Sequence, residues 1–158
     1  RHYSSLTSLG FLQQGHQMKV NTYLNFEGQA EAAFSFYAQV FAAPMGPIMR
    51  MGDMPTDPNA PPLAEDEKNF IMHVELTLPG GHVLMATDML PSLGHHLRVG
   101  NNTTISLEPE SQEEADRLYD LLSEGTAEGS GMMRMPFGYW GSCLDRFNIR
   151  WMINYVAK

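Results

Sequence analysis

The pattern that decides the fold lies near the end of the chain, in the stretch Trp140-Gly141-Ser142-Cys143-Leu144-Asp145-Arg146-Phe147-Asn148-Ile149-Arg150-Trp151-Met152-Ile153-Asn154. A polar turn over 145–148 separates two segments rich in aromatic and β-branched residues, which is typical of a β-hairpin. Alternation along the second segment, 149–156, places Trp151 on one face with Ile149 and Ile153, where we expect a helix to cover them. Asn148 suits a positive φ in the turn, because its short polar side chain tolerates the left-handed region.

Two halves of similar plan follow one another from Met18 onward. Alternation of apolar and polar residues predicts strands, and apolar residues at a spacing of three and four predict helices. The predicted elements of the first half are a strand over 20–26, a helix over 27–43, a strand ending near residue 51, a loop over 52–69 and a hairpin of strands 70–78 and 82–88 around Pro79-Gly80-Gly81. Such a glycine-containing turn favours a hairpin.

The second half repeats this order of elements. A strand over 103–108 precedes the segment Ser111-Gln112-Glu113-Glu114, which predicts the capping box of a helix that ends at Gly125. Three further strands fit between Thr126 and Val156, separated by glycines that mark turns or bulges.

A strand, a helix and three strands, written twice, predict an α+β fold of two βαβββ modules. One helix covers only one face of a four-stranded sheet, so we expect the two modules to pair around a cavity. The first module spans 18–96 and the second 97–158, within one compact domain. Residues 1–17 are rich in serine and glutamine and lack the apolar core of a signal peptide, so we expect a disordered leader or added extension.

Composition and charge narrow the range of functions. With 10 basic and 18 acidic side chains the net charge is -8, which argues against nucleic acid as a partner. No apolar run reaches membrane-spanning length, so no membrane partner is expected. Cys143 is the single cysteine, which excludes an intramolecular disulfide and suits a reducing cytoplasm.

Particular residues also carry a family resemblance. The segment Phe26-Glu27-Gly28-Gln29-Ala30-Glu31-Ala32-Ala33-Phe34, the closing Asp145-Arg146-Phe147 and the strand Trp151-Met152-Ile153-Asn154 resemble the PhnB-like branch of the vicinal oxygen chelate, or glyoxalase/bleomycin-resistance, superfamily. The resemblance covers residues 18–158. Proteins of this branch are often described as 3-demethylubiquinone methyltransferase-like, yet no glycine-rich loop here follows a strand and opens a helix to hold a nucleotide-like cofactor. We therefore expect no cofactor.

Enzymes of the superfamily bind a divalent metal through the first and last strand of each half. Carried over by this resemblance, the four positions fall near Asn21, near Ala86, at Thr103 or Thr104, and near Met152. A methyl, a hydroxyl and a thioether do not suit a transition metal, which needs imidazole, thiolate or carboxylate ligands. The resemblance thus implies a metal site that has been lost, and no metal is expected.

The strand over 70–78 offers a different polar cluster. Alternation places Phe70, Met72, Val74, Leu76 and Leu78 toward the helix, and Ile71, His73, Glu75 and Thr77 toward the cavity. His73 and Glu75 are the candidate catalytic residues, because a histidine beside a carboxylate can anchor a ligand or transfer a proton. The candidate ligand-binding residues are Tyr23, Asn25, His73, Glu75, Arg150 and Asn154. A purely structural His–Glu hydrogen bond across the sheet is the alternative.

Other chemistry-bearing residues have structural explanations. His95 and His96 follow one another in a loop, where histidines are usually solvated. The methionine groups around Met49 and Met133 fit either an adaptable pocket or packing in the core or at an interface. Trp140 could either stack against a ligand or be a buried aromatic residue of the sheet, and the sequence leaves both interpretations open. Cys143 has no basic neighbour in the sequence except Arg146, so it is not a candidate nucleophile.

Two classes of function remain. The first is a small-molecule binding protein whose acidic chain suits a cationic or neutral aromatic guest. The second is an enzyme, either an isomerase, lyase or dioxygenase with relocated metal ligands or a metal-free acid–base catalyst using His73 and Glu75. Exposed sheet edges favour a homodimer. The loop over 52–69, with four prolines and five acidic residues, is expected to be mobile or to act as a flap over the cavity.

Overall fold

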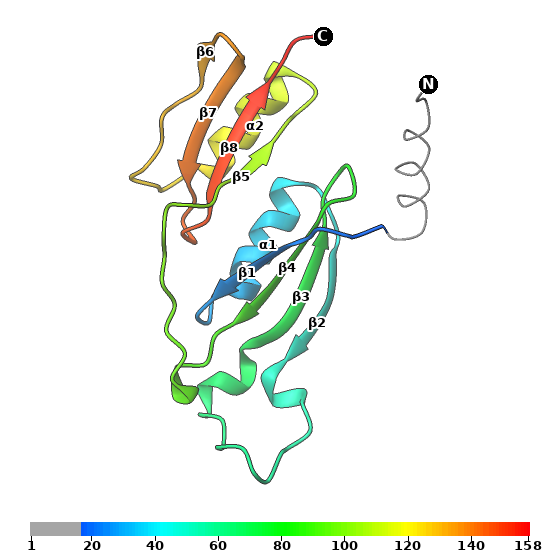
Figure 1. The fold of residues 1–158 in the computed structure, drawn as a ribbon, viewed down its shortest axis with the longest axis vertical. Helices are drawn as coiled ribbons and strands as arrows, with labels where there is room; N and C mark the ends of the chain where they lie inside the picture. Colours follow the sequence, from blue (N-terminus) through cyan, green and yellow to red (C-terminus); the bar gives the residue numbers. More distant parts are fainter. Residues whose placement is uncertain (1–16) are drawn as a thin grey trace, which may run out of the picture.

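The structure contains two separate four-stranded sheets, each covered by one helix (Figure 1). The closing hairpin belongs to the second sheet. The computed structural model describes residues 17–158, so the leader predicted over 1–17 lies almost entirely outside the described residues. The first module contains β1 (Thr22–Phe26), α1 (Ala30–Val40), β2 (Met45–Arg50), η1 (Met51–Asp53), η2 (Asp66–Asn69), β3 (Ile71–Thr77), β4 (Val83–Asp88) and η3 (Pro91–Leu93). The second contains β5 (Ile105–Leu107), α2 (Gln112–Leu122), β6 (Met133–Met135), β7 (Gly138–Leu144) and β8 (Arg150–Tyr155).

The two sheets have the same topology. Their strand orders are β1-β4-β3-β2 and β5-β8-β7-β6, and in each sheet the first and last strand of the module pair in parallel. Parallel neighbours require a long crossover connection, which the helix and the two intervening strands supply here. This duplication confirms the predicted α+β fold of two βαβββ modules.

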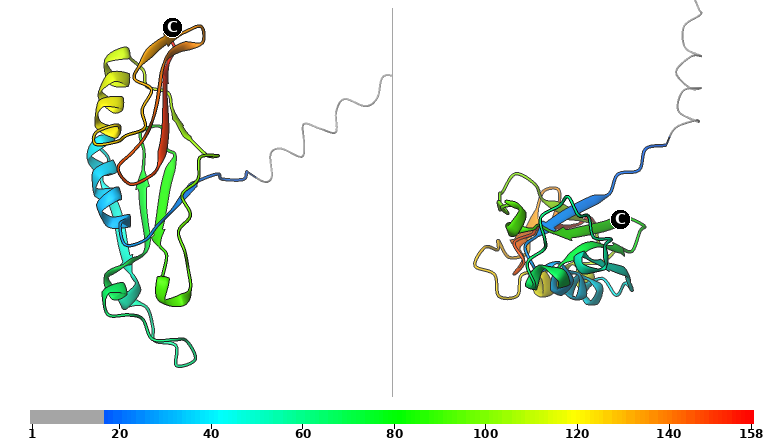
Figure 2. Two further views of the ribbon diagram at one scale, coloured as in Figure 1. Left: turned by 90° about the vertical axis from the view of Figure 1, so that its left-hand side faces the viewer. Right: turned by 90° about the horizontal axis from the view of Figure 1, so that it is seen from below.

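Both helices lie along one side of the molecule and the strands along the other (Figure 2). Helix α1 buries one stripe of residues against its sheet, namely Ala30, Ala33, Phe34, Tyr37 and Val40. Helix α2 buries Ala115, Leu118 and Leu122. Within residues 17–158, no helix lies over the opposite face of either sheet, so this side of the molecule consists of strands and the linker between the modules (Figure 2). This strand side carries the polar candidates described below.

Aromatic packing joins the two modules into one core. The Tyr37 ring of α1 meets Trp151 of β8 edge-on, with the ring centroids 5.4 Å apart, and Phe41 lies 5.6 Å from the same indole. Arg117 of α2 also donates a hydrogen bond of 2.7 Å to the Val40 carbonyl at the end of α1. Trp151 and Ile153 are fully buried, which confirms their predicted place on the helix-facing side.

The turn over 145–148 is held by its own first side chain. Asp145 Oδ1 accepts hydrogen bonds from the Phe147 and Ile149 amides, and Asp145 Oδ2 accepts from Tyr37 Oη at 2.5 Å and Trp151 Nε1 at 2.8 Å. Asn148 has a φ of 68°, as predicted. The buried carboxylate therefore fixes the hairpin and also ties it to α1 of the other module.

A bulge in β3 corrects the predicted alternation. Met49 pairs with His73 but Arg50 pairs with Ile71, so one step along β2 spans two residues of β3. Such an extra residue rotates the side chains beyond it by one position. Ile71 is therefore buried in the core, not open on the face that carries His73, and its amide donates to Asp88 Oδ2 at 2.8 Å.

The loop over 52–69 divides into two parts. Residues 52–62 are exposed, but the side chain of Glu67 in η2 is buried and accepts hydrogen bonds from the amide and hydroxyl of Ser92. Glu67 is therefore an exception among the acidic residues of this loop, because its side chain is buried. Figure 1 shows the exposed part extending away from the second module, so it does not cover the junction of the modules.

No helix within residues 17–158 is both long and apolar enough to cross a membrane.

Candidate functional site

A chain of three hydrogen-bonded side chains lies on the strand side of the first sheet. Tyr23 belongs to β1, and His73 and Glu75 belong to β3, with β4 between the two strands. The register sets Tyr23 and Glu75 level with Met85 in one row, and His73 lies two residues from Glu75 on the same face. These side chains share one face because successive side chains in a strand point to opposite faces of the sheet.

The hydrogen bonds in this chain run in one direction. His73 Nε2 lies 3.0 Å from Glu75 Oε1, and His73 Nδ1 lies 3.1 Å from Tyr23 Oη. A carboxylate only accepts, so Nε2 of His73 donates to Glu75, and in the tautomer with its proton on Nε2 the Nδ1 atom accepts a hydrogen bond from the Tyr23 hydroxyl. This order gives the phenol a base, and the base a carboxylate that orients it.

The Tyr23–His73–Glu75 chain is open to solvent. Tyr23 is 47% exposed, and the side chains of His73 and Glu75 are 27% and 49% exposed. Water weakens hydrogen bonds and charge interactions at such positions, so the chain contributes little to folding stability. A ligand that covered it would exclude this water and strengthen each contact.

A cavity of about 320 Å³ lies beside the hydrogen-bonded side chains Tyr23, His73 and Glu75, at the junction of the two modules. Tyr23 and Asn25 line it from β1, Arg150 lines it from β8, and the linker from Leu97 to Thr103 forms another wall. Cavities that hold small organic ligands begin at about 300 Å³. The structure thus brings together three of the six predicted ligand-binding residues.

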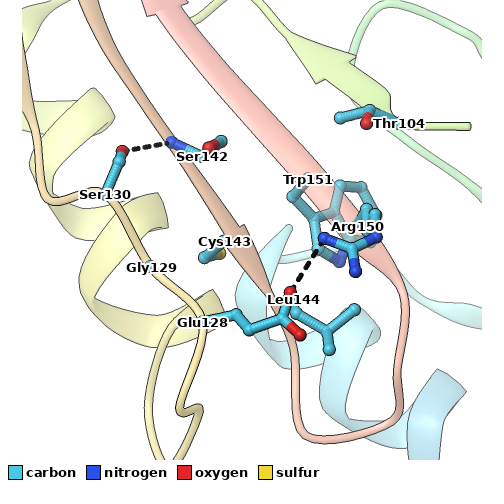
Figure 3. A pocket seen from close by; sticks show the side chains of 9 residues that line it. All are labelled: Thr104, Glu128, Gly129, Ser130, Ser142, Cys143, Leu144, Arg150 and Trp151. Carbon is cyan, nitrogen blue, oxygen red and sulfur yellow. Dashed lines mark hydrogen bonds and ion pairs between the residues drawn. The ribbon is translucent and has the colours of Figure 1, made fainter. Parts of the chain in front are cut away.

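Arg150 is fixed between this cavity and a smaller pocket of about 180 Å³ in the second sheet. Its Nη1 forms an ion pair with Glu128 Oε2 (Figure 3), with the two atoms 3.0 Å apart, and its Nε donates to the Gly100 carbonyl at 3.3 Å. Ser130 accepts a hydrogen bond from the Ser142 amide in the same pocket, at 3.0 Å. The guanidinium is therefore already paired on one side.

Asn154 lies apart from the other predicted residues. It faces Trp140 across the β7–β8 pair, and its Oδ1 is buried without a hydrogen-bond partner. No hydrogen bond or ion pair within residues 17–158 joins His73 or Glu75 to Arg150 or Asn154. The two pairs belong to two different sheets, His73 and Glu75 to the first and Arg150 and Asn154 to the second, and the open faces of both sheets point to the same side (Figure 2).

The four positions carried over for a divalent metal do not form a ligand set. Ala86 is fully buried on the helix-facing side, so the strand side of β4 presents Met85 and Thr87 instead. Met152 pairs with Ser106 and Ser142, and Asn21 precedes β1. Within residues 17–158, no group of three or more His, Cys, Asp or Glu side chains could hold a metal ion. These donors do not suit a transition metal.

The remaining candidates have structural surroundings. Cys143 is buried, and burial, with a smaller contribution from Asp145, raises the pKa of its thiol to about 11. Such a thiol stays protonated at neutral pH and is a poor nucleophile. His95 Nδ1 accepts a hydrogen bond from the Leu90 amide at 3.2 Å, so His95 is a loop residue with a structural contact, and His96 is exposed.

Arg98, Asn102 and Phe147 also line the larger cavity, and sequence reasoning did not single them out. Arg98 and Asn102 belong to the linker between the modules, which has no periodicity to assign a direction to its side chains. Only the fold brings this linker against β1 and the closing hairpin. An arginine and an asparagine in a linker are signals too common to have revealed the site.

A family model described as 3-demethylubiquinone-9 3-methyltransferase matches residues 18–154. The chain belongs to this family. It is 28% identical over 150 residues to Protein YjdN of Escherichia coli (strain K12), a match that covers 89% of this chain and 97% of YjdN. The family assignment confirms the resemblance to the PhnB-like branch.

Solved structures support the same family and fold. Protein PA1353 from Pseudomonas aeruginosa is 28% identical with a TM-score of 0.75, covering 88% of this chain and 98% of that one. The PhnB protein from Bacillus cereus is 25% identical with a TM-score of 0.70, covering 88% and 100%. A glyoxylase/bleomycin resistance protein/dioxygenase domain from Frankia sp. EAN1pec, 16% identical with a TM-score of 0.62 over 90% and 99%, shows the shared fold alone.

Proposed function

We propose that this family member is a small-molecule binding protein that holds its ligand on the strand side. The observation that carries the proposal is the cavity of about 320 Å³ that Tyr23, Asn25 and Arg150 line, next to the polar pair His73 and Glu75. Polar groups of several kinds converge on an otherwise apolar recess, as they do in ligand sites. Asn154 would extend the same polar wall along the second sheet.

We further propose that the superfamily's metal site has been lost in this chain. The donor chemistry supports this, because Met85, Thr87, Ser106 and Met152 offer no imidazole, thiolate or carboxylate on the strand side. A metal held by relocated ligands would have to use His73 and Glu75. Elemental analysis of the purified protein tests this directly, and about one equivalent of zinc, nickel or iron that disappears in His73→Gln would contradict the proposal.

The family description names a methyl transfer, but the residues do not favour one. Asp88 Oδ1 accepts hydrogen bonds from the Gly28 and Ala30 amides at 2.9 Å and 3.1 Å, so the N-terminus of α1 is already occupied by a carboxylate. Ser111 caps α2, accepting from the Glu114 amide at 3.0 Å. A side chain of the chain itself thus caps each helix start, which does not favour a nucleotide-like cofactor at either place.

A second copy of the chain would complete the site. The strand side exposes the apolar side chains of Tyr23, Met49 and Met133, and no element of the described chain covers it. Exposed apolar residues on an uncovered sheet favour association. Two strand sides placed face to face would enclose the cavity and bring the Tyr23–His73–Glu75 chain opposite the second sheet of the other copy. The proposed functional unit is therefore a homodimer in the cytoplasm.

A thermal-shift screen against small metabolites tests the binding function, because a ligand that binds only the folded chain raises its melting temperature. A ligand at 100 times its Kd adds about 2.7 kcal/mol to the free energy of unfolding. We expect His73→Gln to reduce the shift, with the exposed loop variant His96→Gln as the matched control. Equal reduction by both variants would argue against the site.

A metal-free acid–base enzyme is the second candidate, favoured by the hydrogen bonds from Tyr23 to His73 and from His73 to Glu75. In this case Tyr23 would give its phenol proton to one atom of the ligand and take a proton back from another atom of the ligand, while His73 and Glu75 hold the phenol in place. The candidate requires turnover of an identified ligand with a bell-shaped pH profile. Turnover would fall by about 10²- to 10⁴-fold in Tyr23→Phe if the phenol is the acid. Binding without turnover leaves the binding protein as the function.

A further inference from the structure

The cavity at the junction of the modules has a charge opposite to that of the chain. The chain carries 18 acidic and 10 basic side chains. Yet the residues that line the cavity include two arginines, Arg98 and Arg150, and no aspartate or glutamate. A positive recess in an acidic protein attracts anions and excludes cations, because the local charges act at the shortest range.

Arg150 is held in place by the backbone, so its position in the cavity is preorganised. Its Nε donates to the Gly100 carbonyl, and its side chain is only 26% exposed. Glu128, which pairs with Arg150 Nη1 at 3.0 Å, lines the smaller pocket and not the larger cavity. Glu128 is 57% exposed, so this pairing is weak enough for a ligand to compete with it.

The other walls of the cavity divide into amides and apolar side chains. Asn25, Asn102 and Asn148 supply neutral donors and acceptors that can bond an oxyanion without adding charge. The apolar lining residues are Leu24, Leu97, Val99, Ile105, Phe147 and Ile149. The recess therefore suits a ligand with an apolar body and one anionic end.

We propose that the cavity binds a small organic acid, with its carboxylate on Arg98 and Arg150 and its apolar part against Phe147 and the neighbouring aliphatic side chains. This inference rests on the proposed binding function and specifies its ligand class. This ligand class differs from the cationic or neutral aromatic ligand that the net charge of the whole chain favoured. Tyr23 lines the cavity and bonds His73, so the acid would lie beside the Tyr23–His73–Glu75 chain.

Three probes of one shape and different charge test the proposal: benzoate, benzamide and benzamidine. Binding to the full chain is followed by the shifts of backbone amide signals in nuclear magnetic resonance at low salt. We expect benzoate to bind at least about fivefold tighter than benzamide, since a charge-assisted hydrogen bond is roughly twice as strong as a neutral one. Benzamidine should bind weakest, and added salt should weaken benzoate alone.

Variants at exposed positions then locate the binding. Arg98→Gln should weaken benzoate by about fivefold, while Glu128→Gln should tighten it by about two- to fivefold because Arg150 loses its competitor. A gain of affinity in Glu128→Gln cannot come from misfolding. Arg134→Gln is the matched control, since Arg134 is an exposed arginine of β6 outside the cavity, and it should change nothing.

Tighter binding of benzamide or benzamidine than of benzoate would overturn the ligand class and leave the proposed binding function standing. Equal benzoate affinity in the wild-type chain, Arg98→Gln and Glu128→Gln would overturn the location. If none of the three probes binds, the organic-acid inference fails, and the separate metabolite screen then decides whether the binding function fails with it.

Discussion

Two buried aspartates organise the local structure of this protein. Asp88 and Asp145 are both 2% exposed, and each accepts several hydrogen bonds from amides or ring donors. A buried carboxylate is tolerated only when its oxygens are satisfied in this way. Asp145 also raises the pKa of the Tyr37 hydroxyl, although burial is the larger cause. The phenol therefore stays protonated at neutral pH and donates to Asp145.

Removing Asp145 should be costly. In Asp145→Ala, Tyr37, Trp151 and two backbone amides lose their acceptor in a place that water does not reach, so the free energy of unfolding should fall by about 3 to 5 kcal/mol. Tyr37→Phe removes a single donor and should cost about 1 to 3 kcal/mol. Urea unfolding followed by tryptophan fluorescence measures both. The exposed control Asp120→Ala should stay within about 0.5 kcal/mol, and a similar small loss for Asp145→Ala would contradict the role.

The Cys143 thiol should be inert in the folded protein. Its burial and its pKa of about 11 leave almost no thiolate at neutral pH. We expect no reaction with 5,5'-dithiobis(2-nitrobenzoate) at about pH 8 within the time that the urea-unfolded chain needs to react fully. Fast reaction of the native chain would show that the strand opens locally or that the thiol is accessible.

At the scale of elements, bulges and turns determine which side chains of the neighbouring strands and loops are buried. The bulge in β3 buries Ile71 while leaving His73 and Glu75 on the strand side. The 3-10 turn η2 carries Glu67 inward, where it accepts hydrogen bonds from Ser92 of η3. A loop that is rich in proline and acidic residues can therefore still be anchored at one end.

Glu67 should make the stability of this anchor depend on pH. Hydrogen bonds from Ser92 hold the pKa of Glu67 below its ordinary value of 4.5. Since the pKa is lower in the folded than in the unfolded chain, the stabilisation is fully present above about pH 4.5 and is lost as the pH falls through the folded pKa.

Urea unfolding at a series of pH values below about 4.5 should show a steeper loss of stability for the wild-type chain than for Glu67→Gln. Glu124→Gln, a change at an exposed position, should follow the wild-type chain. Parallel curves for the wild-type chain and Glu67→Gln would show that the Glu67 pKa is not depressed.

At the scale of the whole molecule, the two modules share one core on the helix side and leave the strand side uncovered (Figure 2). Tyr37, Phe41 and Trp151 join the modules through their rings, whereas no hydrogen-bonded strand pair among residues 17–158 crosses between the two sheets. One chain therefore presents both halves of the proposed site to the same side and encloses neither. A second copy is the simplest cover for such a surface.

The homodimer should give a mass of twice 17.7 kDa in light scattering at micromolar concentration. Met49→Glu places a charge on the strand side and should yield monomers, because the charge would have to be desolvated at the contact. Met54→Glu is the matched control, since Met54 is 42% exposed and Met49 is 44% exposed, but Met54 follows η1 in the exposed part of the loop. A monomeric wild-type chain, or equal dissociation of both variants, would contradict the proposed assembly.

Local sequence patterns were enough to predict much of the secondary structure and part of the core. The period of two placed Trp151 and Ile153 in the core, the short polar side chain of Asn148 predicted its φ of 68°, and Ser111 capped α2 as its motif required. These features depend on interactions within a few residues of the chain, where stereochemistry leaves few choices. The βαβββ duplication followed from the same local signals.

Only the tertiary structure decided which side chains meet. The crossover that puts β4 between β1 and β3 brings Tyr23 to His73, and the packing of the two modules brings Arg150 of β8 to the cavity that Tyr23 lines. The bulge that buries Ile71 and the linker that carries Arg98 to the cavity have no periodic signal in the sequence. Contacts between distant segments depend on how the modules pack, and the same local patterns are compatible with more than one packing.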